Sequence, residues 1–106
     1  MRHVLFICSR NRLRSPTAEH LFAGPDVETD SAGLAPDADC LLSAEQVEWA
    51  DLIFVMEKQH RTRLTQRFAA ALKGKRVVCL DIPDRYAFMQ TELVTLLRRK
   101  VGVHLS

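Results

Sequence analysis

The sequence predicts an α/β fold in which helices cover both faces of a parallel sheet. Short apolar runs alternate with segments of helical periodicity along the 106 residues, and strands separated by helices pair in parallel through right-handed crossovers. Residues 4–7 are continuously apolar, as expected of a strand that is buried on both faces. Because the chain is 47% hydrophobic and 26% charged with a net charge of +2, we expect one domain over residues 1–106.

The segment after this first strand predicts a helix and then a second strand. Proline is preferred at the first position of a helix, so Ser15 and Pro16 mark a helix start. Gly24, which is followed by another proline, ends this helix. A second strand is expected near residues 27–31, and it leads into Gly33.

The second half of the chain repeats the alternation of strand and helix. Ser43 and Gln46 have the spacing of a capping box, which predicts a short helix through Trp49. A later helix is expected to stop before Gly74, because glycine favours a helix end. The remaining elements are a strand over residues 52–56, a helix over about 58–72, a strand over 77–80 and a helix from near Thr91.

Cys8 and Arg14 flank the connection between the first strand and the first helix. Unpaired N–H groups at a helix start and in a tight loop point into one small volume, where they stabilise an anion. Arg14 can bind two oxygens of a phosphoryl group at once. The same field favours the thiolate of Cys8, and Ser15 can donate a hydrogen bond to that sulfur. Residues 8–14 are therefore predicted to form a phosphate-binding loop, called the phosphate loop below.

The run Val-Leu-Phe-Ile-Cys-Ser-Arg-Asn-Arg-Leu-Arg-Ser-Pro-Thr-Ala-Glu, residues 4–19, resembles the signature of the low-molecular-weight protein tyrosine phosphatases. The resemblance implies that Cys8 attacks phosphorus and that Arg14 holds the equatorial oxygens. It also implies that Asn11 and Ser15 brace the loop, and that the fold is flavodoxin-like with four strands in the order 2-1-3-4. The other loop residues expected to bind substrate are Ser9, Arg10, Arg12 and Leu13. For the two arginines, exposure to solvent alone is an equal alternative.

The resemblance also requires an aspartic acid from a later loop, which protonates the leaving oxygen. The family normally shows Asp-Pro-Tyr there, and Asp84, Arg85 and Tyr86 match it with arginine in place of proline. We therefore expect Asp84 to be the general acid and Tyr86 to contact the substrate. Asp81 directly ends the preceding strand and is the competing candidate. Either aspartate could instead be a turn residue that caps its own backbone.

Two further positions follow from the resemblance, and one segment departs from it. Ser31 stands in a Ser-Ala-Gly sequence, so the resemblance implies that it supports the phosphate loop from a second layer, whereas an ordinary turn serine is equally expected from the residues alone. Segment 34–49 is much shorter than in the family, which usually has an aromatic wall there, so we expect a shallow, open pocket. Leu13 replaces a cysteine that many members carry, so Cys8 is expected to overoxidise more readily.

These residues favour hydrolysis of phosphomonoesters through a cysteinyl phosphate, with no metal or cofactor. The expected partner is a phosphorylated protein, most of all phosphotyrosine, or a small aryl phosphate. Arsenate reduction on the same scaffold is a rival, but Cys40 and Cys79 are too far apart in sequence for the usual disulfide relay. A second rival is a binding module for phosphate or polyanions, nucleic acid included, that has no turnover. It is suggested by the residues Arg10, Arg12, Arg85, Arg98, Arg99 and Lys100.

Cysteine content and hydropathy indicate the cellular compartment of the protein. Three cysteines at irregular spacing do not suggest a disulfide framework and fit a reducing compartment. The N-terminal apolar run ends at Cys8 and is too short for a signal peptide or a membrane span. We therefore expect a cytoplasmic protein without a membrane partner, and the oligomeric state stays open.

Overall fold

The four strands of the computed structural model, which describes residues 2–105, form one parallel sheet. In chain order they are β1 (Arg2–Cys8), β2 (Val27–Gly33), β3 (Leu52–Val55) and β4 (Arg76–Cys79). Their order in the sheet is β2-β1-β3-β4, so β1 and β3 occupy the centre. The predicted parallel sheet and its order are therefore confirmed.

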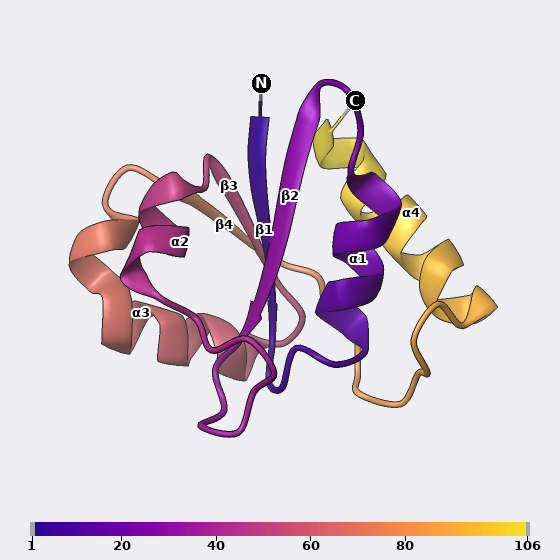
Figure 1. The fold of residues 1–106 in the computed structure, drawn as a ribbon, viewed down its shortest axis with the longest axis horizontal. Coiled ribbons are helices and arrows are strands. Elements are labelled where there is room, and N and C mark those ends of the chain that lie inside the picture. Colours follow the sequence, from indigo (N-terminus) through magenta and orange to yellow (C-terminus); the bar gives the residue numbers. More distant parts are fainter. Residues whose placement is uncertain (1, 106) are drawn as a thin grey trace.

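Two helices cover each face of this sheet, as Figure 1 shows. One face carries α1 (Arg14–Phe22) and α4 (Thr91–Leu105), and the other carries α2 (Ala44–Trp49) and α3 (Lys58–Leu72). Within β1, Val4 and Phe6 belong to one core cluster, and Leu5 and Ile7 belong to the other. Because successive strand residues point to opposite faces, a strand covered on both sides is apolar at every position, as β1 is.

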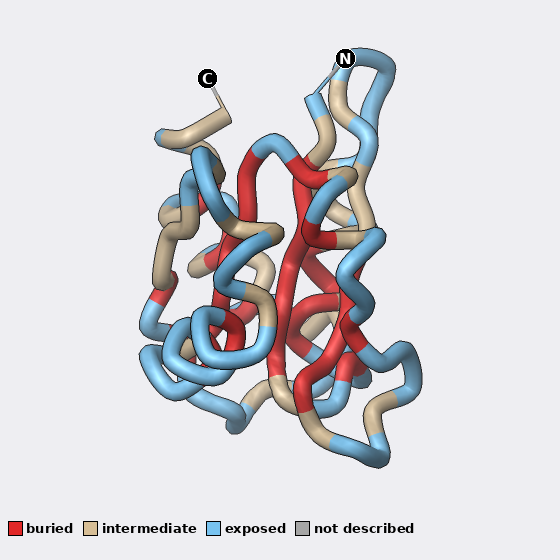
Figure 2. The backbone as a smooth tube through the Cα atoms, turned by 90° about the vertical axis from the view of Figure 1, so that its left-hand side faces the viewer, coloured by how far each residue is buried: buried red, intermediate tan, exposed pale blue. Residues whose placement is uncertain are grey.

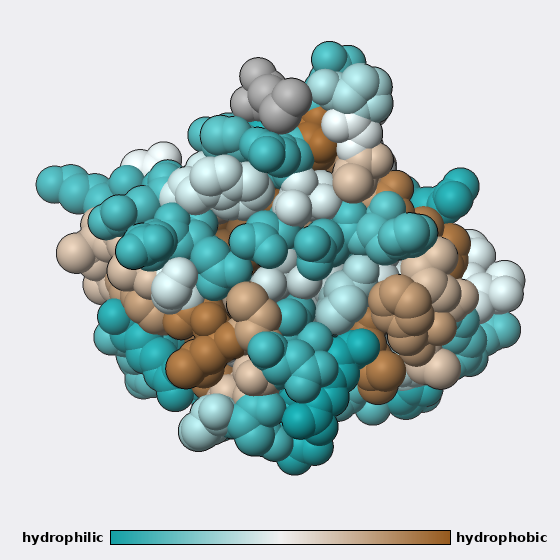
Figure 3. All heavy atoms as spheres, viewed as in Figure 1, coloured by the Kyte–Doolittle hydropathy of each residue, from teal (hydrophilic) through white to brown (hydrophobic). Residues whose placement is uncertain are grey.

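Burial follows this layering. Figure 2 shows that the buried stretches lie mainly in the strands and that much of the outer surface of the helices is exposed. On the face drawn in Figure 3, hydrophobic patches are separated by hydrophilic side chains. Large exposed hydrophobic residues include Leu13, Leu41, Phe88 and Val103. Among residues 2–105, no helix combines the length and the apolar character that a membrane crossing requires.

Helix α1 begins earlier than the sequence predicted. It starts at Arg14, so Pro16 lies within the first turn and not at the first helical position. The N–H groups of the first turn have no partner inside a helix, so proline is tolerated there. The N–H of Thr17 then donates to the Leu13 carbonyl at 3.1 Å. This earlier start places Arg14 on the first turn of the helix, directly at the carboxyl edge of the sheet.

The other boundaries agree closely with the prediction. The capping box is confirmed, since Gln46 N–H donates to Ser43 Oγ at 3.3 Å and Ser43 N–H donates to Gln46 Oε1 at 3.1 Å. Helix α3 has the predicted bounds, although Phe68 interrupts it with a non-helical φ of −128°. The fourth strand ends one residue earlier than expected, at Cys79.

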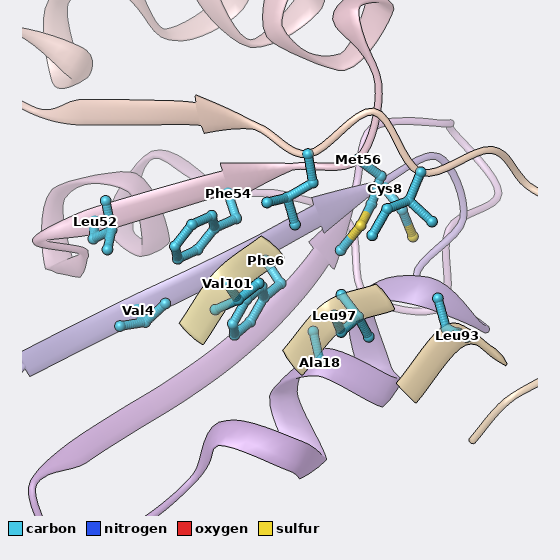
Figure 4. Packing of buried hydrophobic residues seen from close by; sticks show 12 residues of the cluster. Val4, Phe6, Cys8, Ala18, Leu52, Phe54, Met56, Leu93, Leu97 and Val101 are labelled. Carbon is cyan, nitrogen blue, oxygen red and sulfur yellow. The ribbon is translucent and has the colours of Figure 1, made fainter. Parts of the chain in front are cut away.

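The carboxyl ends of the strands meet at one edge of the sheet. Cys8 pairs with Gly33, and Val55 pairs with both Ile7 and Cys79. The loops that follow these strands therefore gather at the lower end of the molecule in Figure 1. Figure 4 shows Cys8 close to Met56, at the edge of the cluster formed by β1, β3 and the helices α1 and α4. In doubly wound sheets, ligands bind at this edge, where the strand order reverses.

Candidate active site

The sulfur of Cys8 is held by the loop that follows β1. The Cys8 side chain is buried, and its Sγ atom lies 2.9 Å from Ser15 Oγ. The backbone N–H of Asn11 also donates to this sulfur, at 3.2 Å. Asn11 has φ 56°, a left-handed conformation that asparagine adopts more readily than most residues. The Asn11 amide and the Ser15 hydroxyl therefore fix the position of the Cys8 sulfur.

Ser15 can serve either protonation state of Cys8. Its hydroxyl oxygen lies 2.9 Å from Asn11 Oδ1 as well as 2.9 Å from the sulfur. A hydroxyl has one proton and two lone pairs. It therefore donates to Asn11 when Cys8 is a thiol that donates to Ser15, and it donates to the sulfur when Cys8 is a thiolate.

The segment after β2, residues 34–43, holds the carbonyl groups of the phosphate loop. The donors are the N–H groups of Leu34, Ala35 and Asp39, and the acceptors are the carbonyls of Cys8, Ser9 and Arg10, at 3.1, 2.8 and 3.0 Å. In a trans peptide the N–H points away from the carbonyl of the preceding residue. The N–H groups of the loop therefore point inward, as that of Asn11 does toward Cys8. The short segment thus orients the amides that would bind an anion.

Ser31 has a different contact from the one that the resemblance implied. Its hydroxyl donates to Glu19 Oε1 on α1, and its backbone N–H donates to Asp30 Oδ1 at 2.8 Å. Sheet register explains the difference, because Ser31 lies opposite Phe6, inside the sheet, whereas the phosphate loop starts at Cys8, opposite Gly33. In the Ser-Ala-Gly sequence, Gly33 and not Ser31 is the residue that approaches the loop.

Arg14 is buried and held by groups from two other loops. Its Nη1 donates to Glu57 Oε2 at 2.8 Å and to the Ile82 carbonyl at 2.6 Å. Its Nε lies 3.7 Å from Asp84 Oδ1. Only 2% of the side chain is exposed, yet Arg14 lines the cavity above Cys8. Because Nη1 is fixed in this way, the guanidinium keeps one orientation and presents its remaining donors to a ligand.

Sequence reasoning missed two residues beside Arg14, namely Glu57 and His60. Burial would raise the pKa of Glu57, but the hydrogen bond and charge of Arg14 outweigh it and lower this pKa. Burial, with the charge of Arg14, lowers the pKa of His60 to about 4. A signal was present for Glu57, because it directly follows the predicted strand over residues 52–56 and such positions lie at the carboxyl edge of the sheet. His60 lies in the helix that comes next and gave no such signal.

A cavity of about 220 Å³ opens above the phosphate loop. Its lining residues are Cys8, Arg10, Arg12, Leu13, Arg14 and Asp84. Asp81, the competing candidate for the acid, lines a separate hollow together with Glu57 and Pro83. Among the two candidate acids, the geometry therefore favours Asp84. The lining does not include Ser9, Asn11 or Ser15. Asn11 and Ser15 instead contact the Cys8 sulfur from within the protein.

Tyr86 is not among the residues that line this cavity. Its ring packs against the core cluster shared by β1, β3, α1 and α4, and the Arg85 guanidinium carbon lies 5.8 Å from the ring centre. Tyr86 thus packs against the protein and makes a cation–π contact with Arg85, and its contact with a substrate stays a prediction. This leaves Leu13 as the largest apolar side chain in the lining.

The arginines Arg10 and Arg12 lie at the rim of the cavity and face the 34–43 segment. Arg12 Nε lies 3.1 Å from Asp39 Oδ1, and Arg10 Nε lies 3.6 Å from Asp37 Oδ2. All four side chains are at least 45% exposed, so each pair contributes little to stability. Both arginines therefore remain accessible to a ligand, and their contact with substrate stays a prediction.

The other cysteines lie outside the cavity lining. Cys40 is exposed in the 34–43 segment, and Cys79 ends β4. Burial raises the pKa of Cys79, which disfavours its thiolate. Within residues 2–105, no group of three or more His, Cys, Asp or Glu side chains has an arrangement that could hold a metal ion.

No family model matches the chain, and no curated protein matches it. Solved structures do match. Wzb from Vibrio vulnificus in complex with benzylphosphonate is 25% identical, with a TM-score of 0.77 over 97% of this chain and 96% of that chain. The low molecular weight protein tyrosine phosphatase from T. tengcongensis is 24% identical, with a TM-score of 0.71 over 97% and 95%. The YwlE arginine phosphatase from Geobacillus stearothermophilus is 20% identical, with a TM-score of 0.71 over 99% and 93%.

These structures match nearly the whole chain, since each covers 97% of it. The similarity predicted from residues 4–19 is thereby confirmed in three dimensions: the chain has the fold of the low-molecular-weight protein tyrosine phosphatases.

Proposed function

We propose that the chain is a cysteine-dependent phosphatase that hydrolyses phosphomonoesters. One observation carries this proposal: Cys8, Arg14 and Asp84 line the same cavity, and the sulfur of Cys8 is held by Ser15 Oγ and Asn11 N–H. A nucleophile, an anion-binding guanidinium and an acid around one small volume are the parts that phosphoryl transfer requires.

In the first step, the thiolate of Cys8 attacks phosphorus. The S–P bond forms, the ester P–O bond breaks, and Asp84 gives its proton to the departing oxygen. Arg14 and the inward amides stabilise the charge on the three remaining oxygens. Asp84 Oδ1 lies 3.7 Å from Arg14 Nε, so the acid stands beside the guanidinium that would hold the transferred group.

In the second step, water attacks the cysteinyl phosphate. Asp84, now a carboxylate, takes the proton from water, the O–P bond forms, and the S–P bond breaks to release inorganic phosphate. Ser15 eases this departure, because its hydroxyl can donate to the sulfur as negative charge returns to it. Between the two steps Asp84 thus changes from general acid to general base, and Cys8 changes from nucleophile to leaving group.

Aryl phosphates, phosphotyrosine among them, are the substrate class that this mechanism favours, because a phenolate leaves more easily than an alkoxide. Phosphoarginine is a second candidate; its P–N bond would break in the first step, and Asp84 would give its proton to the departing nitrogen. One observation supports it: among residues 2–105, no aromatic side chain lines the cavity to pack on a substrate ring. A matching structure is named an arginine phosphatase. Peptides that differ only in carrying phosphotyrosine or phosphoarginine would separate the two.

The proposed activity is tested by comparing wild type with Cys8→Ser on an aryl phosphate and on both phosphopeptides. We expect turnover in wild type, none in Cys8→Ser, and binding of inorganic phosphate by both proteins. Retained turnover in Cys8→Ser would contradict the nucleophile. A wild-type protein that binds phosphate without any turnover would instead support a binding module.

Arsenate reduction is disfavoured by the state of the other cysteines. A disulfide relay needs a second thiolate close to the first, but burial raises the pKa of Cys79 and Cys40 lies outside the cavity lining. Thioredoxin-dependent arsenate turnover should therefore be absent. The single domain over residues 1–106 and the cytoplasmic location stay predictions.

A further inference from the structure

Behind the phosphate loop, two side chains from distant parts of the chain contact each other. Ser9 Oγ lies 2.9 Å from Nε2 of His60, which stands in the first turn of α3. The His60 side chain is only 1% exposed. Burying an imidazole is costly unless its polar atoms have partners, and both ring nitrogens of His60 are bonded. Ser9 follows Cys8 directly in the sequence, and neither Ser9 nor His60 takes part in the mechanism described above.

The contacts define which nitrogen of His60 carries the proton. The backbone N–H of Glu57 donates to His60 Nδ1 at 3.0 Å. Since an amide can only donate, Nδ1 must carry its lone pair, and the proton of the neutral ring is on Nε2. A pKa of about 4, lowered by burial and by Arg14, keeps the ring neutral near pH 7. His60 therefore donates to Ser9 Oγ.

The same ring is connected to Arg14 through Glu57. Glu57 is the N-cap residue of α3 and His60 is its partner in a capping box. The carboxylate of Glu57 accepts from Arg14 Nη1 at 2.8 Å. His60 thus contacts Ser9, the residue after the nucleophile. It also holds the backbone N–H of Glu57, whose carboxylate orients the Arg14 guanidinium.

We propose that His60 is a positioning residue that keeps the phosphate loop and Arg14 in a fixed relation to each other. The proposal rests on the proposed phosphatase function. The loop amides and the guanidinium must converge on the same phosphoryl oxygens, and small displacements of such groups reduce catalysis strongly. His60 limits such displacements through its hydrogen bonds with Ser9 Oγ and with the backbone N–H of Glu57, without touching the substrate.

A conservative variant separates this role from helix capping alone. Glutamine is a usual capping-box partner, because its side-chain oxygen accepts the N-cap N–H. Gln46 does so for Ser43 in α2. His60→Gln should therefore retain the cap of α3 while losing the imidazole contact with Ser9. A histidine that only capped α3 could be replaced by glutamine without loss of catalysis.

The test measures kcat and KM for an aryl phosphate in Ser9→Ala, His60→Gln and the double variant. Each single variant should lower kcat/KM by about 2- to 10-fold, the range for one lost hydrogen bond. The double variant should lose no more than the worse single variant, because both changes break the same contact. Thr62→Ala is the matched control, because it removes an exposed hydroxyl that donates to the Lys58 carbonyl within α3 itself, and it should leave kcat/KM unchanged.

Two outcomes would overturn the proposal: an unchanged kcat/KM in His60→Gln, or losses that multiply in the double variant. A readout independent of turnover keeps this test separate from that of the proposed function. In a Cys8→Ser background, calorimetry with inorganic phosphate should give a Kd about 2- to 10-fold weaker when Ser9→Ala or His60→Gln is added.

If wild type hydrolyses none of the phosphate esters, the proposed function fails, and this weakening of phosphate binding would still support the positioning role. An unchanged Kd would contradict the positioning role, and a Cys8→Ser protein that binds no phosphate would contradict both proposals. Nitrogen NMR of wild type should also find the His60 proton on Nε2, and a proton on Nδ1 would contradict the arrangement.

Discussion

A Cβ atom on Gly33 would lie 2.6 Å from the carbonyl oxygen of Ser9. It would also lie 2.7 Å from Ala38 Cβ and 2.9 Å from the carbonyl carbon of Arg10. These are distances that real Cβ atoms essentially never show, and two of the three obstructing atoms are backbone. The absence of a side chain at Gly33 therefore allows β2 and the 34–43 segment to approach the phosphate loop.

Gly33→Ala should displace the loop from the 34–43 segment. We expect kcat/KM to fall by about 10-fold or more, because the inward amides of the loop and Arg14 would no longer converge on the same phosphoryl oxygens. The free energy of unfolding should fall by about 1–3 kcal/mol, as for other overpacked sites. Gly102→Ala is the matched control, since nothing lies within 4 Å of its Cβ position and it stands in α4. Alanine there should leave kcat/KM unchanged and stabilise the helix slightly.

Equal activity of Gly33→Ala and wild type would show that the loop tolerates a shift, and the proposed role of the close approach would be wrong. Denaturant unfolding and steady-state kinetics on both glycine variants are the measurements that decide this.

Asp84→Asn should reduce the rate by about 10²–10⁴-fold for a phosphate ester with a poor leaving group, since that oxygen must be protonated as it departs. The loss in the first step should be much smaller for an ester whose phenol leaves as the anion. Asp81→Asn is the matched control, because Asp81 lines a different hollow. Rates measured across a series of leaving groups check this, and a larger loss from Asp81→Asn would reverse the assignment.

Glu57→Gln should weaken the hold on Arg14. The substitution keeps the size of the side chain but removes the charge that faces a buried guanidinium at 2.8 Å. Hydrogen bonds to charged groups contribute about 1.5–3 kcal/mol, so we expect a loss of that order in unfolding free energy and weaker phosphate binding. Glu48→Gln, on the exposed side of α2, should change neither. Wild-type phosphate affinity in Glu57→Gln would argue against an orienting role for Glu57.

Stability should fall as the pH is lowered from about 6.5 to 4, because of His60. The unfolded chain binds a proton on this residue near its ordinary pKa of 6.5, whereas burial and Arg14 lower the folded pKa to about 4. The unfolded state therefore binds more protons in this window, so the free energy of unfolding is highest above it and decreases within it. At about 1.4 kcal/mol per pH unit, the loss is at most about 3.5 kcal/mol.

Urea unfolding at a series of pH values checks this prediction. His60→Gln should show a flatter profile between pH 6.5 and 4, whereas His20→Gln, which changes an exposed histidine, should keep the wild-type slope. Parallel profiles for His60→Gln and wild type would mean that His60 titrates normally in the folded protein.

Much of the fold follows from local patterns in the sequence. The continuous apolar run in β1 predicts burial on both faces, and the spacing of Ser43 and Gln46 predicts the start of α2. These signals act over a few residues, so they can be interpreted without knowing what packs where. The start of α1 was predicted too late because proline fits any position of the first turn.

Local sequence alone indicated only the parts of the site that are close in sequence, and Asp84 was assigned through the resemblance. Cys8, Asn11, Arg14 and Ser15 lie in one short segment, where Asn11 and Ser15 contact the Cys8 sulfur. Their roles in catalysis stay predictions. Ser31 and Tyr86 were assigned from the resemblance alone, and sheet register and core packing give them other contacts. The roles suggested here for Glu57, His60 and Gly33 depend on contacts between distant segments.

The central claim is that Cys8 is the nucleophile, because its side chain lines the same cavity as Arg14 and Asp84. Mass spectrometry of wild type that is quenched during turnover of an aryl phosphate tests this claim most directly. We predict a phosphoryl group on the sulfur of Cys8. Turnover in which Cys8 stays unmodified, or in which another residue carries the phosphoryl group, would contradict the account.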